Sequence, residues 1–192
     1  MARSSPLFCF DYLDPLSYLV QRELDALAAE GALPSVRRIP LEIRTPAQPM
    51  LDPDDAPWRT LWARAEEEAA ALGVPLVPPT LLPWTRKAHE LVLHAGEKGV
   101  GDEAHRLVFE ALFRRGRDIG RVDVLVELAR ELGMDAQEAK AVLDVDRFAA
   151  DVAALGAEAR AAGAGSPPTL VLGARTLRGF HNRDALRTFL VR

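Results

Sequence analysis

The stretch "FCFDYLDPLSYL", residues 8–19, is a short apolar run that leads directly into a helix-like pattern. The run is rich in aromatic residues and is bounded by prolines, which predicts a buried strand over residues 7–12. Asp14 then suits the N-cap of a helix and Pro15 its first position. Leucines recur on one face from there onward, so we predict that the strand feeds a helix over residues 15–29.

The chain after this helix contains one more strand-like segment before it becomes helical. Gly31 lies where a helix C-terminal cap is expected. Residues 35–43 are strand-like, but Pro40 removes a ladder donor, which predicts an edge strand or a bulge. Residues 45–57 hold four prolines and several aspartates, which predicts a loop.

A block of helical patterns fills the middle of the chain. It is interrupted by a proline-rich break at residues 73–83 and by glycines at residues 96–101. Asp135 suits the N-cap of a short helix that ends the block. The expected helices otherwise cover residues 58–72, 85–95, 102–115, 123–133 and 146–162.

Near the end of the chain, the spacing of apolar residues changes back to the alternation that is typical of strands. Residues 168–173 and 175–180 predict a hairpin that turns at Gly173. Asn182 suits the cap of a last helix over residues 183–191. The predicted order is strand, helix, strand, helical block, strand, strand, helix, which indicates an α/β protein.

The composition limits the classes of function. The chain has 192 residues, which fits one domain or one domain with a large insertion. A net charge of -4 and the lack of a basic stripe argue against a nucleic-acid partner. No apolar run approaches the ~20 residues of a membrane helix. The N-terminal residues lack the apolar core of a signal peptide, so we expect a cytoplasmic protein without a membrane partner.

Cysteine occurs once, as Cys9. A single cysteine excludes an internal disulfide and a dithiol motif. Because Cys9 lies between two phenylalanines inside the predicted strand, we expect it to act as a small buried hydrophobe.

Three segments together resemble a known family. "FDYLDPLSYL" is similar to the first strand and active-site helix of the DsbA-like thioredoxin family, in its FrnE-like branch and its 2-hydroxychromene-2-carboxylate isomerase and kappa-class glutathione transferase branch. "AHRLVFEALFRRGRDIGRVDVLVELARELGMD" resembles the helical insertion of that family, and "GSPPTLVLGARTLRGFHNRDALRTFL" resembles its cis-proline strand, hairpin and closing helix. The resemblance implies a thioredoxin-like fold with a large all-helical insertion. Residues 1–57 with 145–192 would form the thioredoxin-like domain and residues 58–144 the insertion.

The resemblance also assigns the candidate site. Redox members carry C-P-x-C at the start of this helix, and the matching positions here are Asp14 and Ser17. Neither carries sulfur, so dithiol exchange at this site is excluded. The isomerase and transferase branch carries S-P-x-S followed by Tyr or Trp; Asp14 replaces its first serine, whereas Pro15, Ser17 and Tyr18 match. We therefore name Asp14 and Ser17 as catalytic candidates, with Pro15 and Tyr18 as ligand-binding candidates.

Asp14 has two interpretations. As an N-cap it would stabilise the helix by about 1 kcal/mol without any chemistry. As a functional residue it would hold a carboxylate near a substrate, as a general base or an anchor. Several N–H donors are expected to lower the pKa of this carboxyl group and make it a poor base. We therefore favour the capping role.

The strand after "GSPP" carries the second half of the candidate site. In this fold the residue before the cis-proline pairs its backbone with a peptide or with glutathione. We favour Pro168 as the cis residue because Thr169 follows it, and Pro167 then offers no N–H. In the alternative, Pro167 is cis and Ser166 keeps its N–H. Ser166, Pro167, Pro168 and Thr169 are the remaining ligand-binding candidates.

Histidines and tryptophans give weaker signals. His89 and His94 lie about 140° apart around a helix, so they do not converge on a metal, and we predict no metal site. Tryptophans border the proline-rich breaks, where they would line a pocket or pack in the core, and we favour core packing for Trp58, Trp62 and Trp84.

Three hypotheses for function follow. The leading one is a divergent FrnE-like family member that binds a small molecule or peptide in the cleft without disulfide chemistry. The second is a glutathione-dependent isomerase or transferase that uses Ser17, with glutathione as the only candidate cofactor. The third is a non-catalytic interaction module that forms a homodimer.

Overall fold

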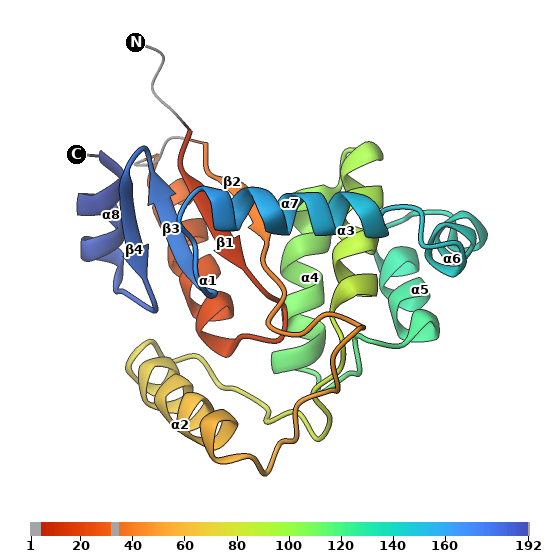
Figure 1. Ribbon diagram of the computed structural model, residues 1–192, viewed down its shortest axis with the longest axis horizontal. Coiled ribbons are helices and arrows are strands. Elements are labelled where there is room, and N and C mark those ends of the chain that lie inside the picture. The colour runs from red at the N-terminus through yellow and green to blue at the C-terminus, as the bar shows by residue number, and fades with distance from the viewer. Residues whose placement is uncertain (1–4, 32–34, 192) are drawn as a thin grey trace. The chain divides into compact units, whose positions relative to one another are not determined.

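The computed structural model describes residues 5–31 and 35–191 (Figure 1). The chain divides into two compact units. The first unit comprises Met1–Ile43 together with Ala154–Arg192, and the second comprises Arg44–Ala153. A single inserted segment therefore separates the two parts of the first unit.

The unit boundaries differ in position from the domain boundaries expected from the sequence. Residues 44–57 and 145–153, which we assigned to the thioredoxin-like domain, cluster with the helical unit. The expectation that the N-terminal residues form no signal peptide concerns the start of the chain. Residues 1–4 lie outside the described residues.

Within the described residues, the first unit is built on a four-stranded sheet with the order β2-β1-β3-β4. Its strands are β1 (Leu7–Phe10), β2 (Arg37–Pro40), β3 (Thr169–Leu172) and β4 (Arg175–Arg178). β1 is parallel to β2, whereas β3 is antiparallel to both of its neighbours. The edge position expected for the strand that contains Pro40 is confirmed, because β2 is an outer strand and ends at this proline.

Three helices belong wholly or partly to the first unit. α1 (Pro15–Ala29) and α8 (Arg183–Val191) lie behind the sheet in Figure 1, and the C-terminal part of α7 (Ala149–Ala161) lies in front of it. α1 has the predicted bounds, and Gly31 follows its C-cap with a φ of 69°. That left-handed conformation carries no steric penalty for glycine, which explains why the helix stops there.

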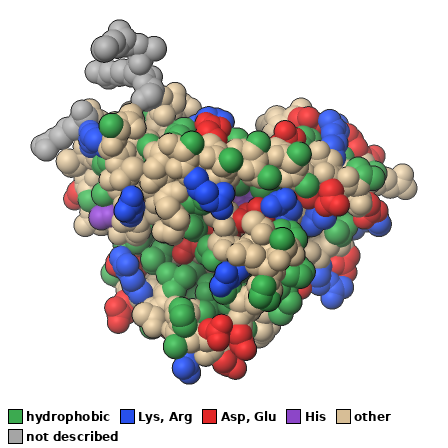
Figure 2. All heavy atoms as spheres, viewed as in Figure 1, with side chains coloured by type: hydrophobic (Ala, Val, Ile, Leu, Met, Phe, Trp, Pro, Cys, Tyr) green, Lys and Arg blue, Asp and Glu red, His purple; other side chains and the backbone are tan. Residues whose placement is uncertain are grey.

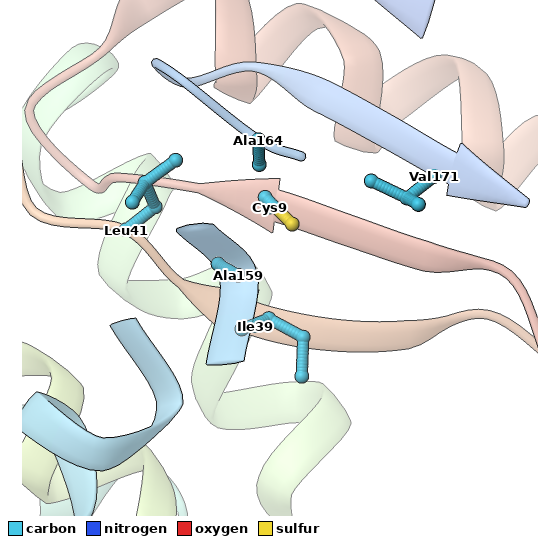
Figure 3. Packing of buried hydrophobic residues seen from close by; sticks show 6 residues of the cluster. All are labelled: Cys9, Ile39, Leu41, Ala159, Ala164 and Val171. Atoms are coloured by element: carbon cyan, nitrogen blue, oxygen red, sulfur yellow. The ribbon is translucent and has the colours of Figure 1, made fainter. Parts of the chain in front are cut away.

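The front face of the sheet packs around Cys9. Figure 3 shows Cys9 on β1 close to Ile39, Ala159 and Val171, which come from β2, α7 and β3. Cys9 is fully buried, as expected for a small hydrophobe. Burial, with a smaller effect of the Glu158 charge, raises the pKa of its thiol to about 11. The thiolate form is therefore scarce at neutral pH, and Cys9 is not a reactive thiol.

The second unit is helical, as the sequence predicted. Helices α3 and α4 pack together, and α3 also packs on α5 and α6. The helices of this unit are α2 (Ala56–Ala71), α3 (Arg86–Glu97), α4 (Gly101–Phe113), α5 (Val122–Glu131), α6 (Ala136–Asp144) and the start of α7.

The start of α7 differs from the expectation. The sequence placed it at Asp146, whereas the helix begins at Ala149. Asp146 has a φ of 54°, which lies in the left-handed region and cannot be part of a right-handed helix. Its backbone carbonyl accepts the N–H of Ala149 at 3.0 Å and closes the turn that precedes the helix.

Figure 2 shows basic and acidic side chains scattered among other residues on the face in view, without a continuous basic stripe. That distribution agrees with the absence of a basic stripe in the sequence. None of the helices within residues 5–31 and 35–191 is long and apolar enough to cross a membrane.

Helix capping in the second unit gives a direct test of the local structure. The Asp135 carboxylate accepts the N–H groups of Gln137 at 2.7 Å and Glu138 at 2.9 Å. Asp55 is the N-cap of α2 and, among the described residues, makes no side-chain capping bond. We expect Asp135→Ala to lower the free energy of unfolding by about 1 kcal/mol, and the matched variant Asp55→Ala to lower it by a few tenths. Urea denaturation measures both, and equal losses would contradict the assigned cap.

Candidate functional site

The candidate site begins in the turn that connects β1 to α1. The backbone N–H of Asp14 donates to the carbonyl oxygen of Asp11 at 3.1 Å and closes a turn after the strand. Asp14 is extended, with φ -87° and ψ 112°, and Pro15 occupies the first turn of the helix. The N-cap role predicted for Asp14 is confirmed. An extended N-cap followed by proline gives a defined helix start.

The Asp14 carboxylate and Ser17 are joined by two hydrogen bonds. One carboxylate oxygen, Oδ2, accepts the backbone N–H of Ser17 at 2.7 Å and its hydroxyl at 2.5 Å. Asp14 is 1% exposed and Ser17 is fully buried. The two candidate catalytic residues are therefore in direct contact, and each satisfies a polar group of the other.

The pKa of Asp14 corrects an expectation. We expected the N–H donors to lower it, whereas burial raises it to about 6. Burial disfavours the charged carboxylate more than the bonds from Ser17 favour it, and the nearby charge of Asp11 raises the pKa further. The sequence argument counted the donors but not the loss of solvent. A pKa of about 6 lies in the range that suits a general base near neutral pH.

Asp11 is a buried charged residue that we did not single out from the sequence. Its side chain is fully buried, and its two oxygens accept the N–H groups of Leu13 at 3.3 Å and Ile43 at 2.5 Å. It thus ties the turn after β1 to the segment after β2. The sequence does contain a signal for this role, because Asp11 is a lone carboxylate inside an apolar run. A buried charge needs hydrogen-bond partners close by.

Pro15 and Tyr18 support the first turn of α1. Both side chains are buried, and the Tyr18 N–H donates to the Asp14 carbonyl oxygen at 3.3 Å. Arg22 donates to the Tyr18 hydroxyl at 3.4 Å, and its guanidinium carbon lies 5.8 Å from the centre of the ring. These contacts within α1 hold Tyr18 in place.

The second half of the site precedes β3. The peptide bond between Pro167 and Pro168 is cis, so Pro168 is the cis residue and Pro167, which precedes it, has no N–H to donate. The Thr169 hydroxyl donates to the Ser166 carbonyl oxygen at 2.6 Å. The Pro168 carbonyl oxygen accepts the N–H of Gly179 at 2.8 Å, which joins the segment to the end of β4.

The sheet register brings both halves to the same end of the first unit. Cys9 pairs with Thr169 in the antiparallel ladder of β1 and β3. Continuing that register by one residue sets Phe10 opposite Pro168, just before the turn that leads to Asp14. The register therefore brings the end of β1 and the start of β3 to the same end of the sheet, although the two segments are more than a hundred residues apart in sequence.

The histidines take different positions in the structure. His89 and His94 are each 1% exposed inside the second unit. Among the residues that the structure describes, no group of three metal-ligating side chains is gathered in one place. His181 lies in the first unit, where its Nε2 is 3.0 Å from the Arg178 carbonyl oxygen.

The tryptophans separate into two roles. Trp58 is 6% exposed and stacks on Trp62, which in turn stacks on Phe113. This cluster agrees with the core packing that we favoured. Trp84 is 36% exposed and lines a cavity of the second unit, so the pocket alternative holds for this residue.

Comparison with known proteins agrees with this architecture. The uncharacterized protein YwbO of Bacillus subtilis (strain 168) is 30% identical over 186 residues, which cover 91% of this chain and 89% of that protein. A probable DsbA oxidoreductase, SCO1869 of Streptomyces coelicolor, is 25% identical and has a similar structure, with a TM-score of 0.76 over 97% of this chain and 88% of that one. A 2-hydroxychromene-2-carboxylate isomerase has a TM-score of 0.79 over 96% of this chain and 91% of that one, at 20% identity, and therefore shows the shared fold.

The family assignment rests on nearly the whole chain. The model of the DSBA-like thioredoxin domain matches residues 7–191. The fold has the expected sheet with a helical insertion, and the single cysteine leaves no C-x-x-C pair. The chain therefore belongs to the DSBA-like thioredoxin domain family.

Proposed function

We propose that this protein is a FrnE-like family member that binds a small molecule at the end of the sheet where β1 leads to Asp14–Ser17 and where Ser166–Thr169 leads into β3, without disulfide exchange. The observation that carries the proposal is the pair of hydrogen bonds from Ser17 to Asp14 at the positions of the two cysteines. Oxygen atoms at both positions cannot form or accept a disulfide. The site therefore supports recognition and proton transfer rather than electron transfer.

The backbone beside Pro168 favours a small molecule over an extended peptide. An extended peptide binds such a segment through paired N–H and C=O groups. Pro167 supplies a carbonyl group but no N–H, so half of that pairing is lost. Glutathione has a peptide backbone and loses the same bond.

A second candidate function is acid–base catalysis of the isomerase type. The pKa of about 6 for Asp14 favours it, because a base is most effective when its pKa lies near the working pH. The Ser17 hydroxyl, 2.5 Å from the carboxylate, would orient a substrate oxygen or relay a proton. The structurally similar protein named as a 2-hydroxychromene-2-carboxylate isomerase adds support at the level of the fold.

Restoring two cysteines tests whether the site keeps the geometry of the family. The Asp14 carboxylate and the Ser17 hydroxyl already meet at 2.5 Å, so Asp14→Cys with Ser17→Cys should form a disulfide, whose sulfurs lie about 2.05 Å apart. We expect the double variant to reduce insulin with dithiothreitol as the electron source. The wild-type protein and each single variant should match the rate without protein. A folded double variant that forms no disulfide would contradict the shared geometry, and activity in the wild type would contradict the non-redox function.

The pKa of Asp14 predicts a specific dependence of stability on pH. Because folding raises the pKa from 3.8 to about 6, the native state holds the proton more tightly than the unfolded state. This contribution to stability is present below about pH 4 and is lost as the pH rises through about 6. Asp14→Asn keeps a capping oxygen but does not titrate.

We expect the free energy of unfolding of the wild type, relative to Asp14→Asn, to fall by an amount on the order of 3 kcal/mol between about pH 4 and about pH 7. Urea denaturation of both proteins across this range measures the difference, and contributions from other groups cancel. A difference that is constant, or that rises with pH, would show that Asp14 titrates as an exposed carboxylate does.

Glutathione tests whether the isomerase-type candidate depends on that cofactor. Above about pH 7 the Asp14 carboxylate is ionised, and a thiolate beside it would be repelled. We expect millimolar glutathione to leave the melting temperature of the wild type unchanged and to raise that of Asp14→Ser, which restores the S-P-x-S pattern. A ligand at about a hundred times its Kd stabilises by ~2.7 kcal/mol, which a thermal-shift assay resolves. Asp14→Asn separates the loss of charge from the gain of a hydroxyl, and a clear shift in the wild type would favour the glutathione-dependent candidate.

A further inference from the structure

The outer strand β4 carries backbone groups that the proposed function does not use. Within residues 5–31 and 35–191, β4 pairs with β3 on one side and with no strand on the other (Figure 1). Three of its four residues are exposed. An outer strand presents N–H and C=O groups to solvent, and these groups can pair with a strand from another chain.

The ladder determines which backbone groups of β4 point outward. In an antiparallel pair, residues that exchange hydrogen bonds alternate with residues whose groups point away from the partner strand. The Gly179 N–H donates to the Pro168 carbonyl oxygen at 2.8 Å, and this pair directly continues the register of β3 and β4. The alternation then directs the groups of Leu177 toward β3 and those of Thr176 and Arg178 outward.

One of the outward groups already has a partner. The Nε2 atom of His181 lies 3.0 Å from the Arg178 carbonyl oxygen, which agrees with an oxygen that faces away from β3. The N–H and carbonyl groups of Thr176 and the N–H of Arg178 have no hydrogen-bond partner among the described residues outside the ladder. These three groups are therefore available to an added strand.

The arginines of β4 have no acidic partners. Arg175 donates to the Phe189 carbonyl oxygen at 2.9 Å, and its guanidinium carbon lies 4.6 Å from the centre of the Phe189 ring. Both of those groups are uncharged. Arg178 is exposed, and neither arginine forms an ion pair within the part of the chain that the structure describes. The strand thus presents two unpaired positive charges.

The opposite outer strand, β2, differs in its charge. Arg37 donates to the Glu158 carboxylate at 2.8 Å, and Arg38 lies 3.8 Å from the Asp25 carboxylate. β2 also ends at Pro40, which has no N–H to offer to a further strand. Of the two outer strands in the described sheet, β4 is the one whose arginines are unpaired.

These charges restrict the class of partner. A second copy of β4 would bring four guanidinium groups together along one edge, and like charges across a strand pair are destabilising. An acidic strand would instead meet a positive charge at both positions. Because Arg175 and Arg178 are three residues apart, their side chains lie on opposite faces of the sheet. The partner therefore needs two carboxylates that are also three residues apart.

We propose that β4 binds an extended acidic segment of another protein, which adds an antiparallel strand to the sheet. The carboxylates of the segment lie opposite Arg178 and Arg175. An apolar residue lies opposite Leu177 and a β-branched residue opposite Thr176. The segment thus reads, from its N-terminus, acidic, apolar, β-branched, acidic. This binding does not depend on the chemistry at Asp14.

Blocked peptides of the sequence Gly-Ser-Glu-Val-Thr-Glu-Ser-Gly test the charges, with Gln or Lys in place of both Glu residues as matched controls. NMR titration of the ¹⁵N-labelled full-length protein gives the Kd and identifies the amides that shift. We expect the Glu peptide to shift the N–H signals of Thr176 and Arg178. At low salt it should bind roughly tenfold more tightly than the Gln peptide, because two cross-strand charge pairs contribute about that factor. The Lys peptide should not bind, and added salt should weaken the Glu peptide.

Three outcomes of this titration would overturn the proposal. The first is a Glu peptide that produces no saturable shift, and the second is a Gln peptide that binds as tightly. The third is a set of shifts at Asp14–Ser17 without shifts on β4, which would assign the peptide to the site of the proposed function.

Methylation of single peptide nitrogens tests the backbone pairing. Methylation of the peptide's Thr nitrogen removes the donor that faces Thr176, whereas methylation of the Val nitrogen changes a group that points away from β4. We expect the first change to weaken binding by more than about tenfold and the second to change it by less than about twofold. Equal effects of the two changes would contradict an added antiparallel strand.

Variants of the protein assign the charge to β4. Arg178→Gln should weaken the Glu peptide about threefold and leave the Gln peptide unchanged, because it removes one of the two charge pairs. Arg37→Gln changes an exposed arginine of the other outer strand and is the matched control, which should bind as the wild type does. Asp14→Asn should also bind normally. Normal binding of the Glu peptide by Arg178→Gln, or an equal loss in Arg37→Gln, would overturn the assignment to β4.

Discussion

The bond between the Asp14 carboxylate and Ser17 is the interaction on which the candidate site depends. It caps the start of α1 after the turn that follows β1, and it holds the two candidate side chains against each other. The same carboxylate is almost completely buried. Two opposing effects therefore act on one group: donors at the helix start favour its charge, and burial disfavours it. Burial has the larger effect, and the result is an acid whose pKa is about 6.

That result changes what the substitution means chemically. A thiolate at a helix start is stabilised by the donors and carries electrons to a disulfide. Asp14 also lies at a helix start, but it is a carboxyl group, which can transfer a proton and not electrons. Its pKa of about 6 lies close to neutral pH. Cys9 does not restore the lost chemistry, because burial in the sheet raises its pKa to about 11.

Much of the fold follows from local sequence signals, and the deviations follow from non-local ones. Asp14 and Gly31 mark the ends of α1 by rules that involve only neighbouring residues, and the structure agrees with them. The pKa of Asp14 depends on how much of the folded chain surrounds it, which no local pattern contains. Asp146 looked like a helix start from composition, but its positive φ is set by the turn that it closes. Trp84 resembled the other tryptophans in sequence, and only packing separated its exposed face from theirs.

The candidate site at Asp14 is built from residues of the first unit. The Asp14 carboxylate and the Ser17 hydroxyl are buried, and each is hydrogen-bonded to the other residue. A ligand that binds there must therefore compete with these internal hydrogen bonds. A ligand that replaces one of these bonds must supply an equivalent donor or acceptor, because a buried polar group left without a partner costs about 1–3 kcal/mol.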